Sequence, residues 1–312
     1  MRNARDHGGG LDAAVAEFGG AKDDWIDLST GINPVPYTFA PPPPHAWAAL
    51  PDQGAGDALI TAARQFWNVP DGAAILPTAG CSSAIALIPL LHPAHRVEIA
   101  GPTYNEHAAS FAHHGWDVAQ TAPDAAARVV VNPNNPTGDF QTPAPAPLLT
   151  IIDESFCDIA PNRSLIHRAA EPGHLILKSF GKFWGLAGLR LGFVIGDCAL
   201  VNALRAKLGP WQVSGPALDI GRQALCDTGW AQTTRAQLAQ GAAQLDEYMT
   251  RFQAQPMGQV SLFRTYQVDD AQALYQRFAR HRVLTRIFPY SNTWIRLGLP
   301  HPHDWARLWG IS

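Results

Sequence analysis

Charged residues are scarce in this sequence of 312 residues, at 16% against 46% hydrophobic residues. The formal net charge is only −3, so there is no basic excess of the kind that binds nucleic acid or an anionic membrane. Cysteine is rare too, and Cys81, Cys157, Cys198 and Cys226 lie far apart with no C-x-x-C pair. This spacing argues against a disulfide framework or a zinc site and predicts reduced thiols in a cytoplasmic protein.

Long uninterrupted hydrophobic runs are also absent. The longest uncharged stretch, Ala73–Leu91, approaches the length of a membrane span but is broken by Pro77, Gly80 and Pro89. It is better explained as a buried strand, a loop and a helix. The charged N-terminal residues are followed by no apolar core, so we expect no signal peptide. The histidines do not group with acids or cysteines as metal ligands do, and we expect no metal site.

Short apolar runs alternate with segments of helical period through most of the chain. The expected strands are Ala74–Pro77, Arg96–Ala100, Arg128–Val131 and Thr150–Asp153, and the expected helices are Asp57–Trp67, a segment ending near Leu91, and Glu106–His114. This order predicts an α/β fold with a mostly parallel sheet covered by helices on both faces. Three prolines between Asp139 and Leu149 leave little room for a crossover helix there.

The two ends of the chain differ from this middle part. Residues 1–50 are rich in loops around a short amphipathic segment, Leu11–Phe18. A helical region from Ser214 to Phe252, broken near residues 227–229, precedes a second alternating region. Its expected elements are the strand Val260–Tyr266, the helix Asp270–His281 and the strands Val283–Ile287 and Thr293–Leu297. We therefore expect an N-terminal arm (1–48), a large domain (49–205) and a smaller α/β domain (206–312).

Polar residues follow the ends of two predicted strands. An Asn-Pro turn, Asn132–Gly138, follows one buried strand, and Asp153 ends the next. Ligands of open α/β sheets bind at the carboxyl ends of strands, so both are candidates for a ligand site. Turn formation alone would also explain the asparagines. Asp153 could cap a helix or pair with a cationic ring nitrogen of a cofactor.

Thr78–Ser83 precedes an apolar helix, where free backbone amides favour an anion, although serine and glycine start many helices. A glycine-rich loop between two apolar strands holds Lys182 and Arg190. We expect Phe183 and Trp184 to wall the lysine and to favour the neutral amine that forms a Schiff base. Two surface cations in a strand–turn–strand are the alternative.

In chain order, these segments resemble the signatures of the pyridoxal-phosphate-dependent class I and II aminotransferase superfamily. The matching motifs are Asn135–Gly138, Asp153–Glu154 and Ser179-x-x-Lys182, with Arg190 eight residues after the lysine. The resemblance covers nearly the whole chain. It implies the aspartate aminotransferase-like fold, pyridoxal 5'-phosphate as the cofactor, and a homodimer.

The resemblance also implies a role for each residue. Lys182 would form the Schiff base and shuttle protons at the substrate Cα, while Asp153 would keep the pyridinium nitrogen protonated. Asn135 would donate to the ring's phenolic oxygen, and Tyr104 would stack on the ring face. The residues implied for the cofactor phosphate are Gly80, Cys81, Ser82, Ser179 and Arg190.

Other segments imply a phosphorylated amino acid as substrate. Within the superfamily the closest resemblance is to the threonine-phosphate decarboxylases of cobalamin biosynthesis, which share features with His7–Gly9, Asn33–Pro34 and Trp294–Pro300. Arg296 would bind the substrate α-carboxylate, unless it is a solvated strand arginine, and Arg286 would face the substrate phosphate. His7 and Asn33 could complete that pocket, although the glycines beside His7 could simply order a terminal residue.

The expected reaction is decarboxylation of L-threonine O-3-phosphate to (R)-1-amino-2-propanol O-2-phosphate. A histidinol-phosphate-type aminotransferase is the alternative, and a non-catalytic cofactor-binding regulator is a third hypothesis. Two departures from the superfamily stand out. Phe156 occupies the position of a tyrosine that bonds the ring oxygen in many aminotransferases, and Leu50 that of a tyrosine that reaches the neighbouring subunit's cofactor.

Overall fold

The structure is a computed structural model that describes residues 7–311 and divides into two compact units. The first unit contains the described chain up to Val35, the short segment Pro136–Gly138 and the chain from Thr234 onward. The second unit contains Pro36–Asn135 and Asp139–Thr233. The domain boundaries expected at residues 48 and 205 therefore both lie inside the second unit.

Residues 36–48 belong to the second unit because they pack on its helix α7 (Gly215–Cys226). The backbone N–H of Ala40 donates to Oε1 of Gln223 at 2.9 Å. Helix α2 (Pro44–Ala48) approaches Gly215 so closely that a Cβ at this glycine would lie 2.3 Å from the carbonyl oxygen of Ala46.

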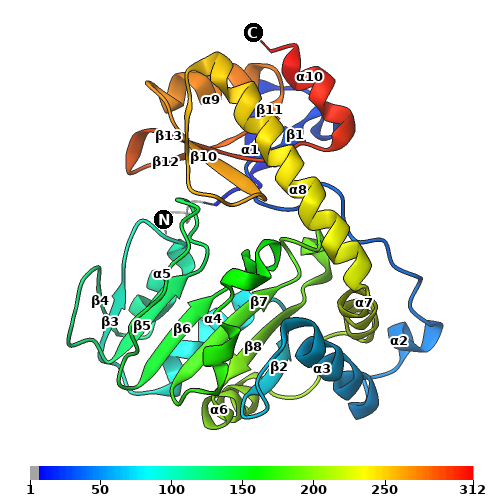
Figure 1. Cartoon of the computed structure of the whole chain (residues 1–312), viewed down its shortest axis with the longest axis vertical. Helices are drawn as coiled ribbons and strands as arrows, with labels where there is room; N and C mark the ends of the chain where they lie inside the picture. The colour runs from blue at the N-terminus through cyan, green and yellow to red at the C-terminus, as the bar shows by residue number, and fades with distance from the viewer. Residues whose placement is uncertain (1–6, 312) are drawn as a thin grey trace. The chain divides into compact units, whose positions relative to one another are not determined.

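The second unit is built on a seven-stranded sheet (Figure 1). In spatial order its strands are β2 (Ala74–Thr78), β8 (Gly192–Gly196), β7 (His174–Ser179), β6 (Leu149–Asp153), β5 (Ala127–Val131), β3 (Arg96–Ile99) and β4 (Asp117–Ala119). Neighbours pair in parallel, except that β8 is antiparallel to both β2 and β7. The predicted α/β class and mostly parallel sheet are confirmed.

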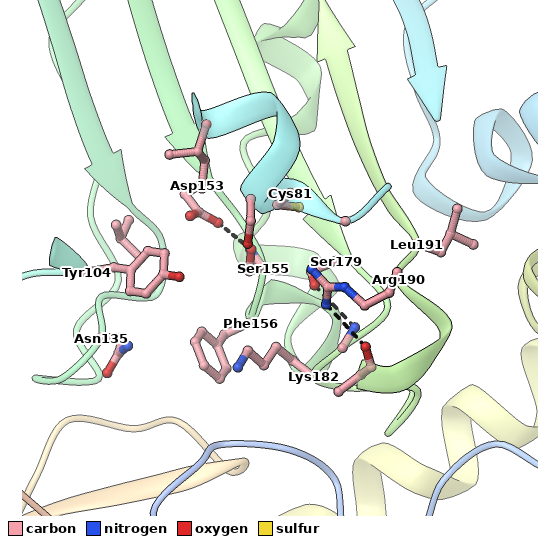
Figure 2. Close-up of a pocket in the computed structure, with 16 residues that line it drawn as sticks. Cys81, Tyr104, Asn135, Asp153, Ser155, Phe156, Ser179, Lys182, Arg190 and Leu191 are labelled. Atoms are coloured by element: carbon pink, nitrogen blue, oxygen red, sulfur yellow. Dashed lines mark hydrogen bonds between the residues drawn. The ribbon is translucent and has the colours of Figure 1, made fainter. Parts of the chain in front are cut away.

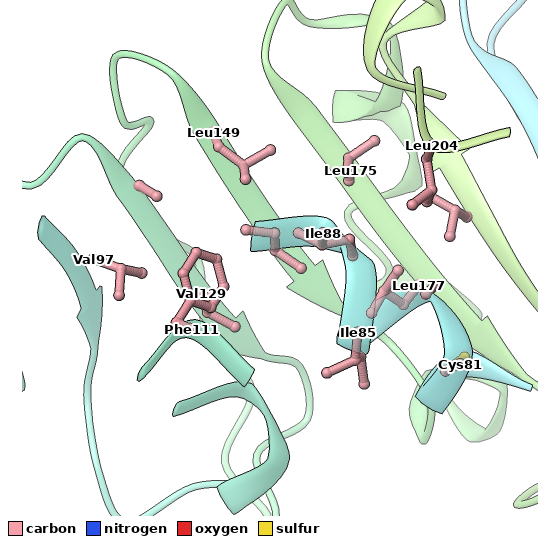
Figure 3. Packing of buried hydrophobic residues seen from close by; sticks show 14 of the residues in the cluster. Cys81, Ile85, Ile88, Val97, Phe111, Val129, Leu149, Leu175, Leu177 and Leu204 are labelled. Carbon is pink, nitrogen blue, oxygen red and sulfur yellow. The ribbon is translucent and has the colours of Figure 1, made fainter. Parts of the chain in front are cut away.

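Helices cover this sheet because alternate strand residues point to opposite faces. The remaining helices of the second unit are α3 (Gln53–Trp67), α4 (Cys81–Leu87), α5 (Asn105–His113) and α6 (Cys198–Leu208). On one face, Ile85 of α4 and Phe111 of α5 pack against Val129, Leu149 and Leu177 in a buried cluster (Figure 3). On the other face, Trp67 of α3 contacts Phe193 of β8, with ring centroids 4.9 Å apart.

Proline explains two features of the connections. The helix predicted to run to Leu91 ends at Leu87 and continues as a 3-10 turn, Ile88–Leu91, because Pro89 cannot donate a helical hydrogen bond. Within the described chain, residues 139–148 form no helix between the parallel strands β5 and β6, as their three prolines predicted.

The first unit contains two small sheets. Strands β1 (Ile26–Asp27) and β11 (Val283–Leu284) pair in parallel, and the second sheet has the antiparallel order β12 (Arg286–Phe288), β13 (Ser291–Gly298), β10 (Phe263–Gln267) and β9 (Gln255–Met257). Its helices are α1 (Leu11–Phe18), α9 (Ala271–Arg280) and α10 (Trp305–Trp309), while α8 (Thr228–Met249) crosses the boundary between the units. The single strand predicted at Val283–Ile287 is wrong, because the chain changes sheets at Thr285.

Candidate active site

A cavity of about 240 Å³ opens at the carboxyl ends of β5, β6 and β7, entirely within the second unit (Figure 2). Every residue predicted to bind the cofactor lines it. Its lining residues are Gly80, Cys81, Ser82, Ile85, Tyr104, Val131, Asn135, Asp153, Ser155, Phe156, Ser179, Gly181, Lys182, Ala187, Arg190 and Leu191. Segments more than 100 residues apart in sequence therefore meet at one sheet edge.

One end of the cavity is cationic. A Cβ at Gly80, the residue before α4, would lie 2.7 Å from Nη2 of Arg190, so only glycine lets the guanidinium come this close. Gly192 similarly allows β8 to approach α4, since a Cβ there would lie 2.6 Å from the backbone nitrogen of Cys81. Arg190 itself has φ of 54°, a left-handed conformation that costs energy in a non-glycine residue. The backbone geometry thus brings one guanidinium to the amides that begin α4.

Asp153 supplies a buried negative charge in the cavity wall. Its Oδ2 lies 2.8 Å from Nε2 of His107, and its Oδ1 accepts hydrogen bonds from the backbone N–H and the hydroxyl of Ser155 at 2.9 and 2.6 Å. Burial alone raises the pKa of Asp153, but the bonds from His107 and Ser155 outweigh this and hold the pKa below its ordinary value. The carboxylate therefore stays ionised although it is only 3% exposed.

Lys182 is the one lysine that lines the cavity, but its surroundings differ from the prediction. Phe183 and Trp184 do not line the cavity: both are fully buried, and Trp184 stacks on Trp230 at 5.3 Å. The ring beside Lys182 is that of Phe156, with 5.2 Å between Nζ and the ring centroid. The other lysine of this segment, Lys178, does not line the cavity. Its side chain points to the opposite face of the sheet, with Nζ 2.6 Å from Oε2 of Glu154.

Tyr104 and Asn135 complete the wall on the β5 side. Tyr104 is half-buried, and its ring makes an edge contact with His107 at 6.0 Å. Burial, followed by the charge of Asp153, raises the pKa of Tyr104 to about 12, so its phenol is neutral at physiological pH. Asn135 is half-buried and follows the Asn132–Pro133 turn. Figure 2 shows both side chains on the side of the cavity opposite Arg190.

The four residues predicted to bind substrate all lie in the first unit. Arg286 and Arg296 are paired directly across the antiparallel strands β12 and β13. Arg296 is buried, and its Nη2 donates to the carbonyl oxygen of Ser29 at 2.6 Å. Asn33 is buried and accepts a hydrogen bond from the backbone N–H of Val35, while His7 is exposed. The predicted alternative of a solvated Arg296 is wrong.

His107 and Ser155 were missed by the sequence analysis. His107 shares its predicted helix with His113 and His114, and nothing in that segment indicates a partner 46 residues later. Ser155 did have a signal, since a hydroxyl two residues after an aspartate commonly closes a turn onto that carboxylate.

Among residues 7–311, no histidine, cysteine, aspartate and glutamate side chains form a group of three or more suited to a metal ion. Nor does any helix in that part have the length and apolar character needed to cross a membrane.

The chemistry of the cavity fits pyridoxal 5'-phosphate. The guanidinium of Arg190 and the start of α4 complement a phosphate, and the buried Asp153 carboxylate complements a protonated ring nitrogen. Lys182 brings a primary amine to the same cavity, as attachment to an aldehyde requires.

Comparison with known proteins agrees with this chemistry. The family model for aminotransferase class I and II matches residues 23–304. Threonine-phosphate decarboxylase from a Sinorhizobium species is 40% identical over 94% of this chain and 92% of its own, and that from Pseudomonas aeruginosa is 36% identical over 97% and 96%. The structure of histidinol-phosphate aminotransferase from Sinorhizobium meliloti in complex with pyridoxal-5'-phosphate superimposes with a TM-score of 0.82 at 18% identity, over 99% of this chain and 94% of its own.

These matches confirm the predicted pyridoxal-phosphate-dependent transferase fold and the predicted cofactor. The protein is accordingly a pyridoxal-phosphate-dependent enzyme. With a family model matched along nearly all of its length, the chain belongs to the aminotransferase class I and II family.

Proposed function

We propose that this enzyme decarboxylates L-threonine O-3-phosphate to (R)-1-amino-2-propanol O-2-phosphate, as a step of cobalamin biosynthesis. The observation that carries the proposal is its similarity to two threonine-phosphate decarboxylases, which covers more than nine-tenths of each chain compared. If the similarity were limited to the cofactor motifs, it would not indicate which substrate is used. The alignments instead extend over nearly the whole length of both proteins, including the segments outside the cofactor motifs.

The cavity residues have distinct tasks in this reaction. A bound pyridoxal 5'-phosphate would supply an electron sink for the pair that departing CO₂ leaves at the substrate Cα. Asp153, ionised through His107 and Ser155, holds a proton on the ring nitrogen. Lys182 anchors the cofactor and then delivers a proton to Cα in place of the lost carboxyl group.

The other lining residues fix the ring and its phosphate. Tyr104 remains neutral and packs against the ring face, and Asn135 donates to the ring oxygen. The phosphate is bound by Gly80, Cys81, Ser82, Ser179 and Arg190.

Arg286 and Arg296 support a substrate with two anionic groups. Their positions are directly opposite one another in the sheet, so two guanidinium groups are available at neighbouring points for a ligand with two anionic groups. An amino acid that carries a phosphate and a carboxylate does so. We assign the carboxylate to Arg296 and the phosphate to Arg286, with His7 and Asn33 completing the pocket.

The orientation of the bound substrate would decide which bond breaks. With Cα–CO₂ perpendicular to the cofactor ring, the electrons of that bond could enter the ring and CO₂ would leave. An orientation that presents Cα–H would instead lead to amino transfer. Incubation with O-phospho-threonine should release one CO₂ for each aminopropanol phosphate formed, without a 2-oxoacid. Amino transfer that depends on a 2-oxoacid and releases no CO₂ would replace this function with the aminotransferase, and a spectral change without turnover would indicate a regulator.

The enzyme acts, we further propose, as a cytoplasmic homodimer. Trp47 and Leu50, at and after α2, are 70% and 68% exposed beside a groove of about 160 Å³ that α2 and α7 line. A second copy of the chain would cover this apolar surface. Sedimentation should give the mass of a dimer for the natural chain and that of a monomer for Trp47→Asp/Leu50→Asp.

The cytoplasmic location is proposed because four free cysteines suit a reducing compartment. Cell fractionation would test it.

A further inference from the structure

A buried polar cluster lies on the face of the sheet opposite the His107–Asp153 pair. It contains the carboxylates of Glu154 and Asp158 and the ammonium of Lys178, whose side chains are 0%, 4% and 1% exposed. Glu154 follows Asp153 directly, and consecutive strand residues point to opposite faces, so the two acids share one strand end but not one environment. None of the three charged residues lines the cavity.

Glu154 is the centre of this cluster because each of its two carboxylate oxygens accepts two hydrogen bonds. Oε2 lies 2.6 Å from Nζ of Lys178 and accepts from the hydroxyl of Ser164. Oε1 accepts from the backbone N–H of Leu165 and, at 3.2 Å, from Nδ2 of Asn132. A carboxylate with this many donors in a dry environment holds those donors in fixed positions.

Two of the four donors to Glu154 come from the ends of strands that lead to cavity residues, while Ser164 and Leu165 lie in the connection between β6 and β7. Asn132 follows the last residue of β5 and precedes Asn135 by three positions. Lys178 is the penultimate residue of β7, four positions before Lys182. One carboxylate thus joins the ends of β5, β6 and β7, and each of these ends leads into a residue that meets the cofactor.

Asp158 extends the same cluster to the lysine loop. Its Oδ1 accepts from the indole N–H of Trp67 at 2.9 Å, and its Oδ2 accepts from that of Trp184 at 3.2 Å. Trp184 lies two residues after Lys182. Lys178 is within 3.6 Å of Oδ1 of Asp158, so a single ammonium connects the strand ends with the loop.

We propose that Glu154 is a positioning residue, whose carboxylate sets the relative positions of Asn135, Asp153 and Lys182 and thereby the affinity for the cofactor. This inference rests on the proposed roles of those three residues. Stability alone explains the cluster less well, because buried ion pairs are often no more stabilising than apolar residues of similar volume. The placement of this pair at the strand ends of the cavity is the feature that a stabilising role leaves unexplained.

The test compares apoproteins reconstituted with pyridoxal 5'-phosphate. Glu154→Gln removes the charge, and Glu154→Gln/Lys178→Met removes both charges and so avoids an unpaired buried ammonium. Glu98→Gln is the matched control, since Glu98 forms a partly buried cross-strand ion pair with Arg128 of the same sheet, away from the cavity. For each protein, three quantities are measured. They are the dissociation constant of the cofactor, the pH at which the absorption band of the bound cofactor (the chromophore) is half changed, and the melting temperature of the apoprotein.

We expect Glu154→Gln to weaken cofactor binding about tenfold and to move the chromophore midpoint, while Glu98→Gln changes neither by as much as twofold. The double variant should regain melting temperature relative to Glu154→Gln without regaining affinity. If all variants lose melting temperature but keep the natural dissociation constant and midpoint, Glu154 is only structural and the inference is overturned. If the natural chain itself binds no cofactor, or keeps its chromophore after Lys182→Ala, the assigned roles have failed instead.

Discussion

Nε2 of His107 and Oδ2 of Asp153 lie 2.8 Å apart, and both side chains are at most 3% exposed. The pair joins helix α5 to the end of strand β6, where Asp153 lines the cavity and His107 does not. It explains how a carboxylate can remain charged where burial alone would favour its neutral form. Asp153, which we propose faces the ring nitrogen of the cofactor, thus depends on a residue that does not itself line the cavity.

His107→Ala should raise the pKa of Asp153, because burial would then be opposed by Ser155 alone. We expect cofactor affinity to fall about tenfold, as for the loss of one buried charge-assisted hydrogen bond. Titration of the apoprotein with pyridoxal 5'-phosphate measures this. His113→Ala, on the exposed side of the same helix, is the control and should bind like the natural chain.

The same pair predicts an acid dependence of stability. The pKa of folded Asp153 lies below its ordinary value of 3.8, so its stabilisation is complete above that value and is lost as pH falls through the folded pKa. In His107→Ala the two pKa values are closer, and less stability should be lost on acidification. Denaturant unfolding measured from pH 6 down to pH 2 tests this, since the loss is expected below 3.8, and parallel curves for the two proteins would contradict it.

Phe156→Tyr should change the titration of the bound cofactor. The Phe156 ring lies beside Nζ of Lys182, and a hydroxyl there could donate to the ring oxygen that Asn135 is proposed to bind. A second hydrogen-bond donor stabilises the negative charge on that oxygen, so the proton that the oxygen shares with the lysine nitrogen is lost at a lower pH. The chromophore midpoint should therefore fall by about one pH unit, or 1.4 kcal/mol, in a spectroscopic titration. Phe156→Leu should not lower it.

Arg286→Met should separate recognition of the phosphate from the chemistry. We expect the KM for O-phospho-threonine to rise roughly 30-fold or more, since a charge-assisted bidentate contact is lost, while slow turnover of threonine changes little. Steady-state kinetics with both substrates measure the difference. Arg280→Met, an exposed arginine of α9, serves as the control. Equal losses with both substrates would assign Arg286 to something other than the phosphate.

Cysteine reactivity should divide the four thiols into two classes. Burial, followed by the charge of Asp153, raises the pKa of Cys81 to about 12, and burial also raises the pKa of Cys157. At pH 8 only about one Cys81 thiol in ten thousand would be ionised. Exposed Cys198 and Cys226 should react with a disulfide reagent first, so Cys198→Ser/Cys226→Ser should lose the fast phase. Rapid labelling of Cys81 would contradict the burial of this thiol.

Much of the fold could be predicted because the apolar pattern is strong. The segment Leu11–Phe18, which was expected to be amphipathic, forms helix α1 with the same bounds, and strands β5 and β6 differ from expectation by about one residue. Strand β4 was missed, since its three residues are exposed or half-buried and carry little apolar signal. The direction of β8 was not predicted, because an apolar run has no direction until its neighbours are known.

At the site, motif order predicted which residues meet in one cavity but not what surrounds them. Phe183 and Trp184 are adjacent to Lys182 in sequence, yet the turn sends them into the aromatic core. Phe156, His107 and the Glu154 cluster come from other segments, and their contacts depend on side-chain direction across a twisted sheet. Local sequence carries that information only when the partners are neighbours along the chain.

The reversed direction of β8 has a practical consequence. Ser179, the last residue of β7, is paired with Gly192, the first residue of β8. The loop that carries Lys182 and Arg190 therefore begins and ends at one pair of opposite residues in the sheet. A parallel strand would have required a crossover to the far edge of the sheet. The lysine and the arginine therefore form one transplantable module. A relative's loop of equal length could replace residues 180–191 in a single exchange without altering any strand connection.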